Sequence, residues 1–462
     1  MLRHVNDKIR GAAQKVMAHA YGDNAMNQPA APFLAGAPID TPQEALTAAA
    51  ALPLVLATYP LFESLRTCRL QTYVAQATGY GRAPVNVLSA STHQWTHKDR
   101  DIVTPANDLL YFCAWVNLAD GPVTLHVPAL ADASRYYVVE LLDAWTNNFE
   151  NLGPRNVPAA GADIVLAGPG QHAEGDHVVR CPTSLVWLLG RVLVTGADDL
   201  PAASAFQNGF RLSGGTRMQP ACVRDWQDGG EPALDFFANI FNALREYPAE
   251  PSAAGLLSLL RKCGIRAGDA VDVGALRPAV QQGLVRAWHE GMALIEANTR
   301  SHARKSWTYS LLLGRYGDDW MQRAVTAMKG LGALRADEAV YAAADYDADG
   351  ELLHGRHAYA LHFPAGHLPP AQAFWSVSLY GADRFFTDNA IGRYALGDRS
   401  PGLQYDADGG LTLTISHQRP TQAQDNWLPA PDGPFYLILR LYQPTDGFMA
   451  GDYVIPPLRR VA

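Results

Sequence analysis

The stretch TPANDLLYFCAWVNL, residues 104–118, decides the first half of the fold. From Leu109 to Trp115 it is apolar and aromatic, which predicts a largely buried β-strand. Asn107 and Asp108 stand directly before this strand, although both side chains compete for backbone hydrogen bonds and are poor strand formers. The pair therefore either caps a strand or presents an acid at the lip of a pocket.

Short β-type runs separated by glycine and proline occupy residues 79–225 and predict a first β-sandwich domain. Over residues 226–340 the period changes, and apolar residues recur at helical spacing. Residues 341–462 return to alternating runs with turn residues, which is typical of a sandwich or jelly roll. Residues 1–78 form an N-terminal helical segment in this interpretation.

Length and charge narrow the class of protein. With 462 residues, of which 48% are apolar, the chain is too long for one hydrophobic core. The expected fold class is mainly β with a helical layer (α+β), built as two antiparallel β-sandwich or jelly-roll-like domains joined by helices. A net charge of −8 and no basic run argue against a nucleic-acid partner.

The N-terminal residues 1–24 show no continuous apolar core of the kind that a signal peptide needs, so we expect a cytoplasmic location. The longest apolar stretch, residues 46–62, is shorter than a membrane span and contains Pro53 and Pro60, which favours a buried helix. Five widely spaced cysteines without a CxxC pair indicate reduced, structural thiols. The expected partner is a small-molecule substrate, without membrane or nucleic acid, and a homo-oligomer stays open.

Two patterns raise the question of a metal. DYDADGELLHGR (345–356) begins like a calcium loop, but Arg356 replaces the bidentate glutamate, so we expect an Asp-Gly hairpin turn. His93 and His97 are four residues apart, and four more histidines cluster within 354–367, yet no carboxylate stands at a recognised spacing such as HExxH. We therefore predict no metal and no cofactor, although a site assembled from distant segments stays open.

Several long motifs resemble a known pair of domains. TPANDLLYFCAWVNLADGPVTLHVP (104–128), RYYVVELLDAWTNNFENLGPR (135–155) and CPTSLVWLLGR (181–191) resemble domain-of-unknown-function family 1254. DYDADGELLHGRHAYALHF (345–363) and NWLPAPDGPFYLILRLYQP (426–444) resemble its usual companion, domain-of-unknown-function family 1214. The resemblance implies two β-sandwich or jelly-roll-like domains packed with intervening helices, and it gives no reaction.

The chemistry is sought in polar residues set into apolar strands. Asp108 and Tyr111 open one strand, Asp143 closes another, and Arg155 follows nearby in sequence. If the strand ends converge, Asp108 would act as general acid or base, Tyr111 as its partner and Arg155 as the stabiliser of developing negative charge. These four are the predicted catalytic residues. The predicted substrate-binding residues are Asn107, Trp145, Asn147, Arg191, Arg393, Tyr394 and Trp427, with Asn426 and Arg440 as further candidates.

Each candidate also has a structural interpretation. Asp108 would cap a turn, Asp143 would pair with Arg155, Arg440 would be a buried ion-pair partner, and the tryptophans would fill the cores.

Three functions remain open on this reading of the residues. The favoured function is a metal-independent hydrolase or lyase that acts on a polar or sugar-like metabolite by carboxylate general acid–base catalysis, in a cleft between the β domains. The alternatives are a metal-assisted enzyme that uses histidines with Asp143, and a non-catalytic carbohydrate or small-molecule binding protein.

Overall fold

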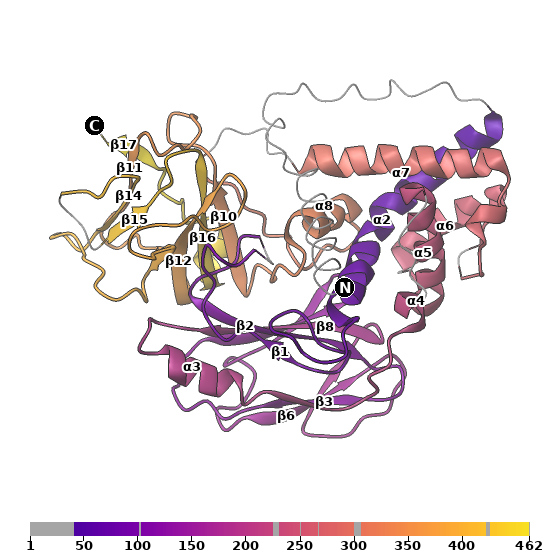
Figure 1. The fold of residues 1–462 in the computed structure, drawn as a ribbon, viewed down its shortest axis with the longest axis horizontal. Helices are drawn as coiled ribbons and strands as arrows, with labels where there is room; N and C mark the ends of the chain where they lie inside the picture. The colour runs from indigo at the N-terminus through magenta and orange to yellow at the C-terminus, as the bar shows by residue number, and fades with distance from the viewer. Residues whose placement is uncertain are drawn as a thin grey trace.

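Helices and strands occupy nearly equal shares of the chain, 27% and 26%, in four mostly antiparallel sheets and a group of helices (Figure 1). The protein is therefore a mixed α+β chain, with more helix than the expected mainly β fold. The structure, a computed structural model, describes residues 41–100, 103–224, 231–249, 251–266, 268–299, 306–421 and 426–461.

Two sheets build the first β domain. One has the order β1-β2-β8-β4-β5, with bounds Ser89–Ala90, Leu109–Asn117, Leu185–Leu193, Tyr137–Asp143 and Asn148–Leu152. The other has the order β7-β6-β3-β9, with bounds His177–Arg180, Ala162–Ala167, Val123–Val127 and Arg211–Gly214. The two sheets share one hydrophobic core, beside which the short helix α3 (Leu200–Gln207) lies. β6 and β7 pair in parallel, which the expectation of purely antiparallel sheets did not include.

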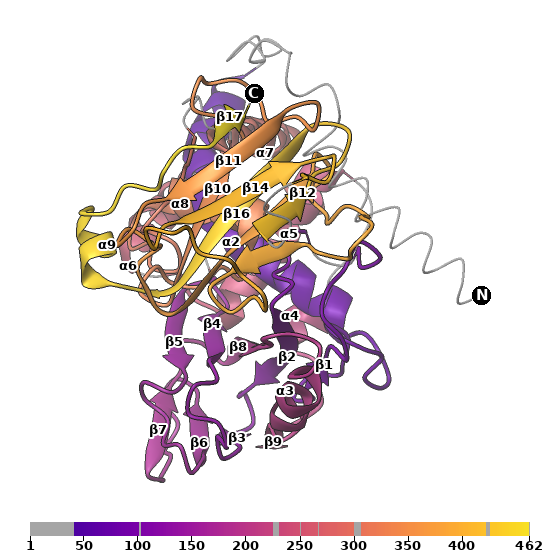
Figure 2. The ribbon, with the colours of Figure 1, turned by 90° about the vertical axis from the view of Figure 1, so that its left-hand side faces the viewer.

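The C-terminal β domain also consists of two sheets around a shared core. The first has the order β10-β16-β12-β13, with bounds Ala339–Ala344, Phe435–Pro444, Ala371–Gly381 and Ala395–Gly397. The second has the order β15-β14-β11-β17, with bounds Trp427–Pro429, Leu411–Ser416, Ala358–Phe363 and Arg459–Val461. β14 and β15 are parallel, and the short helix α9 (Asp446–Ala450) follows β16. In Figure 2 these sheets lie in front, with the first β domain below them.

The helices form a separate layer over one end of the first sheet (Figure 1). They are α2 (Pro42–Thr72), α4 (Ala221–Arg224), α5 (Pro232–Glu246), α6 (Pro251–Leu259), α7 (Pro278–Asn298) and α8 (Trp320–Gly330), with the 3-10 turns Leu260–Cys263 and Val273–Ala275. α2 and α7 approach closely because Gly283 and Gly291 lack a Cβ. A Cβ there would come within 2.5 Å of Thr47 and 2.6 Å of Val55.

The apolar stretch at 46–62 lies inside α2. In the described part of the chain, α2 is the only helix that is long and apolar enough to cross a membrane. However, 61% of its apolar window is buried inside the protein. Thr41 caps its start by accepting a hydrogen bond from the N–H of Glu44 at 3.1 Å. All five cysteines are buried and free.

The outward face of the first sheet is shared between two neighbours. Residues near one end of its strands pack with the helices, and residues near the other end pack with the C-terminal sheet. The strip between these two contacts positions the candidate site.

Candidate functional site

The two β domains meet along strands whose outward-facing residues change from apolar to polar. Leu109, Val138 and Leu193 of the first sheet pack in one cluster with Phe374 and Tyr442 of the C-terminal sheet. Side chains return to the same face of a strand every two residues. Next to this cluster lies a group that we call the first polar row, made of Tyr111 on β2, Arg191 on β8 and Glu140 on β4. Tyr111 is paired with Arg191, which is paired in turn with Val138, so Glu140 lies two residues further along β4.

The C-terminal sheet carries a matching row. Phe374 and Ala339 are each paired with Tyr442 across β12, β16 and β10, and all three belong to the apolar cluster. Two residues further along the same strands, the register pairs a tyrosine, an arginine and a serine. We call this the second polar row, made of Tyr341, Arg440 and Ser376.

Glu140 and Arg191 form a buried ion pair in the first polar row. Nη1 of Arg191 donates to Oε2 of Glu140 at 2.8 Å, and Nη2 donates to the backbone oxygen of Gly332 at 2.9 Å. Oε1 of Glu140 has no hydrogen-bond partner among the described residues. Burial therefore raises the pKa of Glu140 to about 7, although the Arg191 guanidinium opposes part of this shift. A carboxyl group of this kind exchanges its proton near neutral pH.

Arg440 is the cation of the second polar row and is only 3% exposed. Its Nη1 donates to Oγ of Ser378 at 3.1 Å and to the hydroxyl of Tyr380 at 2.8 Å. Its Nη2 donates to the backbone oxygen of Thr104 at 2.6 Å. The guanidinium also lies 5.8 Å from the ring centroids of both Tyr341 and Tyr380. In the described part of the chain Arg440 forms no ion pair.

Asp108 lies beside the second polar row. Both of its carboxyl oxygens are buried, and neither has a hydrogen-bond partner in the residues that the structure describes. Burial raises the pKa of Asp108 above its usual range, and the nearby Ser376 hydroxyl and Arg440 guanidinium offset only part of that effect. Native proteins seldom leave a buried polar group unpaired, so this carboxyl group is the strongest functional signal at the domain boundary.

Three phenol rings line the boundary next to these groups. The hydroxyl of Tyr111 accepts a hydrogen bond from the N–H of Ala106 at 2.9 Å. Its ring packs edge-on against Tyr80 and Trp95, with centroid distances of 5.8 and 6.2 Å. Tyr80, Tyr111 and Tyr341 are only partly buried, so they are the part of this cluster that solvent reaches.

Strained backbone is found on both sides of the boundary. Thr104 has φ 53° and Arg384 has φ 68°, a region that residues other than glycine rarely adopt. The N–H of Thr104 donates to the backbone oxygen of Arg384 at 2.9 Å, while the oxygen of Thr104 accepts from Arg440. The two strained residues thus join loops of the two domains directly at the Arg440 guanidinium.

The predicted carboxylate pair does not form. Asp108 precedes Leu109, which pairs with Leu193 at one end of β8, whereas Asp143 pairs with Val186 at the other end. β2 and β4 are both antiparallel to β8 and therefore run in the same direction, which places the start of one and the end of the other at opposite edges.

Asp143 instead shapes the turn that follows β4. Its Oδ1 accepts from the N–H of Asn147 and its Oδ2 from Nδ2 of Asn147, both at 2.9 Å. Thr146 in this turn has φ 69°. Trp145 is 3% exposed and packs in the core shared with the helices. The turn is therefore held by its own side chains.

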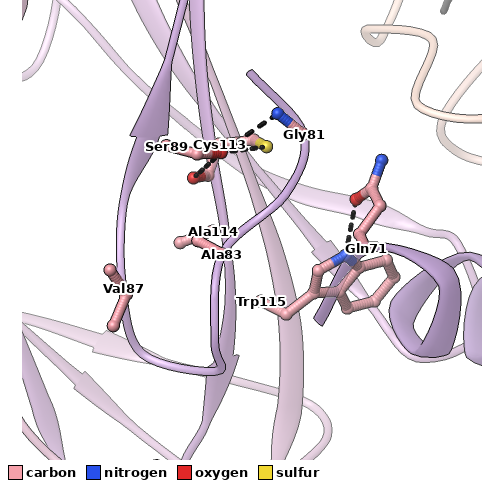
Figure 3. Close-up of a pocket in the computed structure, with 8 residues that line it drawn as sticks. All are labelled: Gln71, Gly81, Ala83, Val87, Ser89, Cys113, Ala114 and Trp115. Carbon is pink, nitrogen blue, oxygen red and sulfur yellow. Dashed lines mark hydrogen bonds between the residues drawn. The ribbon is translucent and has the colours of Figure 1, made fainter. Parts of the chain in front are cut away.

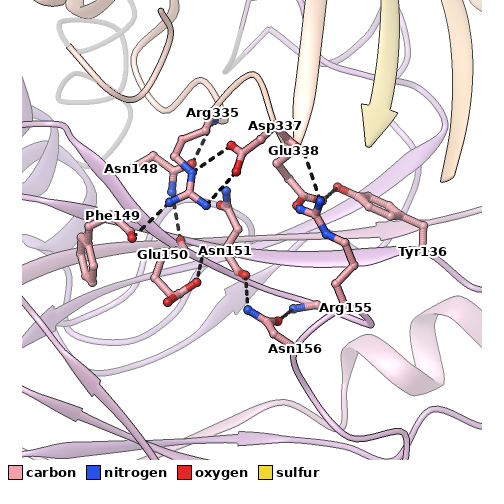
Figure 4. A network of polar contacts seen from close by, with 11 residues as sticks. Tyr136, Asn148, Phe149, Glu150, Asn151, Arg155, Asn156, Arg335, Asp337 and Glu338 are labelled. Carbon is pink, nitrogen blue, oxygen red and sulfur yellow. Dashed lines mark hydrogen bonds and ion pairs between the residues drawn. The ribbon is translucent and has the colours of Figure 1, made fainter. Parts of the chain in front are cut away.

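Arg155 lies in a network that joins the two domains (Figure 4). Its guanidinium pairs with the carboxylate of Glu338, which also accepts from the hydroxyl of Tyr136 at 2.7 Å. The neighbouring Arg335 donates its N–H to Oδ1 of Asn148 at 3.0 Å. Arg155 thus connects the domains away from Asp108, and the anticipated pairing of Arg155 with Asp143 is replaced by the contact with Glu338.

The remaining predicted binding residues hold loops. Nδ2 of Asn107 donates to the backbone oxygen of Trp95 at 2.7 Å. Nη1 of Arg393 donates to the backbone oxygen of Trp427 at 2.9 Å, and the Trp427 indole donates to the oxygen of Ser416 at 3.0 Å. The hydroxyl of Tyr394 lies 2.7 Å from Nδ1 of His97 in the first domain. The structure therefore brings together Asp108, Tyr111, Arg191 and Arg440 from the sequence candidates. Asn107 and Tyr394 hold the loops beside this group, and the other candidates lie elsewhere.

No group of three histidine, cysteine, aspartate or glutamate residues in the described ranges could hold a metal ion. Nε2 of His93 lies 2.9 Å from Oδ1 of Asp99. The calcium-like segment forms a turn in which Oδ1 of Asp347 accepts from two backbone N–H groups and Oδ2 accepts from Nε of Arg460 at 2.7 Å. Because Gly350 adopts φ 79° there, the Asp-Gly step is used as a turn.

A small crevice lies at the other end of β2 (Figure 3). It is too narrow to admit a water-sized sphere. The indole of Trp115 donates to Oε1 of Gln71 at 2.8 Å, and the Ser89 hydroxyl lies 3.4 Å from Sγ of Cys113. Burial raises the pKa of the Cys113 thiol to about 11, so this cysteine is not an activated nucleophile.

Glu140, Tyr341 and Ser376 were not predicted from the sequence. Glu140 had a usable signal, because it is the one charged residue before the terminal Asp143 in β4, a strand in which every residue is buried. Tyr341 and Ser376 gave none, because a tyrosine or serine in an alternating strand is ordinary.

Two family models match the chain. One, described as a protein of unknown function (DUF1254), matches residues 85–214, and the other, described as a protein of unknown function (DUF1214), matches residues 338–446. The first polar row lies within the former range and the second polar row within the latter. No curated protein matches the chain.

One solved structure extends the similarity in fold to most of the chain. The VPA0106 protein from Vibrio parahaemolyticus aligns with a TM-score of 0.68 at 24% identity, over 91% of this chain and 100% of that chain. A putative uncharacterized protein from Burkholderia cenocepacia aligns with a TM-score of 0.45 at 15% identity, over 91% of this chain and 94% of that chain. The first similarity shows a shared fold.

Proposed function

The chain belongs to the two-domain family that joins DUF1254 to DUF1214, and we propose that it is a small-molecule enzyme whose active site lies where these domains meet. The proposed reaction is hydrolysis or elimination on a polar or sugar-like cytoplasmic metabolite by carboxylate general acid–base catalysis. The observation that carries the proposal is the buried carboxyl group of Asp108, whose two oxygens have no hydrogen-bond partner among the described residues.

Asp108 is the proposed general acid. Its raised pKa keeps its proton on at higher pH than in an ordinary aspartate. In the reaction this proton passes to the leaving group, and the carboxylate regains a proton from water or from the substrate. The Tyr111 hydroxyl, whose oxygen accepts from the Ala106 N–H, keeps its own proton available for the substrate. Tyr111 belongs to the partly exposed phenol rings at this boundary.

Glu140 is the proposed second proton-transfer group. Its pKa of about 7 suits exchange at neutral pH, and Arg191 holds it in one position through a 2.8 Å hydrogen bond. Arg440 takes the charge-stabilising role that the sequence analysis gave to Arg155, because Arg440 lies beside Asp108 whereas Arg155 is paired with Glu338.

We also propose that each β domain is a two-layer sandwich. The support for this is that each pair of sheets shares one hydrophobic core. A jelly-roll connection of the strands stays a prediction.

The test compares wild type with Asp108→Asn, which keeps the side-chain volume and removes the proton exchange. Both proteins are incubated with a cell metabolite extract without added metal, and the compounds consumed are identified by mass spectrometry. We expect wild type to consume a compound that Asp108→Asn consumes at least about 100-fold more slowly, the usual contribution of a general acid or base.

Asp199→Asn is the matched control. Asp199 is paired with Arg135 in the same domain, so this variant changes an aspartate outside the proposed site. We expect it to retain wild-type turnover. Equal consumption by wild type and Asp108→Asn would contradict the proposal. If neither consumes a compound but both retain one on the protein, the non-catalytic binding function is supported instead.

A further inference from the structure

The arginines at the domain boundary differ in how their charge is balanced. Arg155 is paired with Glu338, Arg191 with Glu140 at 2.8 Å, and Arg384 with Asp345 at 3.7 Å. Arg440 has no such carboxylate partner in the described part of the chain, although it is the deeply buried cation of the second polar row. Burying a charge without a close counter-charge is costly, so a protein that keeps one there has a use for it.

We propose that the ligand of this site carries an anionic group, a carboxylate or a phosphate, which binds to the Arg440 guanidinium together with Ser376 and Asp108. This inference rests on the proposed function for its location, and it adds the chemical class of the substrate.

The hydrogen bonds of Arg440 leave it free to bind such a group. A guanidinium has five N–H groups, and the three hydrogen bonds to Ser378, Tyr380 and Thr104 use two on Nη1 and one on Nη2. One N–H on Nη2 and the one on Nε remain. Bonds from a guanidinium to carboxylate or phosphate oxygens are about twice as strong as bonds between neutral groups.

Ser376 and Asp108 supply further donors at the same place. Ser376 is paired in register with Arg440 and is 3% exposed. Its hydroxyl oxygen is within hydrogen-bonding geometry of no described residue. In its protonated form Asp108 donates a hydrogen bond as well. An anion beside these three groups would pair with the guanidinium and accept from the Ser376 hydroxyl and from protonated Asp108, which lie near each other. A neutral ligand would leave the charge of Arg440 unbalanced.

Among the described residues, Asp108 is the carboxyl group whose charge acts on Arg440 and could neutralise it without a ligand. Against this, it is not within ion-pair distance of Arg440 in the described structure, and burial raises its pKa. Burial therefore favours the neutral form of Asp108, which does not balance the positive charge of Arg440. The two readings differ in a measurable way, because only an anion site responds to added anions.

The test titrates the protein with inorganic phosphate and, separately, with acetate, at constant ionic strength maintained with chloride, and follows binding by isothermal titration calorimetry and melting temperature. We expect saturable binding of at least one of the two anions to wild type. We expect Arg440→Gln to weaken it at least about 10-fold, since a charged hydrogen-bonded contact contributes about 1.5–3 kcal/mol.

Two further variants keep the test decisive. Ser376→Ala removes a hydroxyl that bonds to no described residue, so it should fold normally and weaken binding several-fold. Arg135→Gln removes a buried arginine paired with Asp199 in the first domain, and it should leave anion binding unchanged. If Arg440→Gln does not fold, Ser376→Ala alone decides the matter.

The outcomes separate this inference from the proposed function. Absence of saturable binding, or equal binding by wild type, Ser376→Ala and Arg440→Gln, overturns the anion site. Anion binding that depends on Arg440, with no compound consumed in the extract, supports the site and rejects the enzyme. Consumption of an uncharged compound without anion binding rejects the site and keeps the enzyme. Preference between phosphate and acetate identifies which anionic group the site takes.

Discussion

The apolar cluster and the two polar rows lie side by side on the same strands, two residues apart, yet they connect the domains in different ways. In the apolar cluster, Phe374 stacks on Tyr442 at 4.2 Å, and both rings belong to a group of buried residues from the two domains. In the polar rows, Glu140 and Asp108 keep unpaired oxygens, and the phenol rings reach solvent. The contrast teaches that one part of the boundary holds the domains together, while the other part holds reactive groups in place.

The largest expected effect is the removal of the stacked ring. Phe374 is 1% exposed, so Phe374→Ala should lower the free energy of unfolding by about 4 kcal/mol, through lost burial and the cavity left behind. Urea unfolding followed by tryptophan fluorescence measures this. Val454→Ala, at a residue that is 83% exposed, is the control and should change little. A loss below about 1 kcal/mol for Phe374→Ala would mean that the apolar cluster does not hold the domains together.

A smaller effect is expected from the polar side and depends on pH. Burial raises the pKa of Glu140 from 4.5 to about 7, so its proton stabilises the folded state below pH 4.5 and this contribution is lost as the pH rises through about 7. The difference amounts to about 3 kcal/mol. In Glu140→Gln this part of the pH dependence should disappear.

Unfolding titrations at intervals from pH 4.5 to 8 give the slope for each protein. Glu351→Gln, on an exposed turn, should keep the wild-type slope. The other buried carboxyl groups remain in both proteins, so the difference in slope isolates Glu140. Identical slopes for wild type and Glu140→Gln would show that the first polar row does not perturb this carboxyl group.

The smallest expected effect concerns backbone strain next to Arg440. Thr104 is a β-branched residue at φ 53°, and its hydrogen bonds to Arg384 and Arg440 are made by its backbone. Thr104→Gly should therefore stabilise the fold by about 1 kcal/mol by relieving strain. Thermal unfolding measures the gain. A clear destabilisation would mean that the threonine side chain contributes contacts that outweigh the strain.

Particular residues show how far the sequence could be interpreted. The run Leu109 to Trp115 was predicted as a buried strand, and it lies within β2, where nearly every residue is buried. The two-domain family was also identified correctly from its motifs. The fold class was right as α+β, although the helices take a larger share than expected. These features depend on local alternation and on long motifs, which a single sequence carries.

Only part of the candidate site could be predicted from the sequence. Asp108, Tyr111, Arg191 and Arg440 were singled out because each is polar within an apolar run, and the structure brings them to one boundary. Asp143 carried the same signal and lies at the opposite end of the sheet. Polarity within an apolar run therefore marks residues that need an explanation, without showing which of them are neighbours.

The sequence by itself determined the strands, the buried helix, the Asp-Gly turns and the presence of charged residues inside apolar runs, because these depend on spacing between near neighbours in the chain. Only the tertiary structure decided that β2 and β4 run in the same direction, which separates Asp108 from Asp143. It also decided that the first and second polar rows lie close together, since this depends on how the two domains pack and not on near neighbours in the chain.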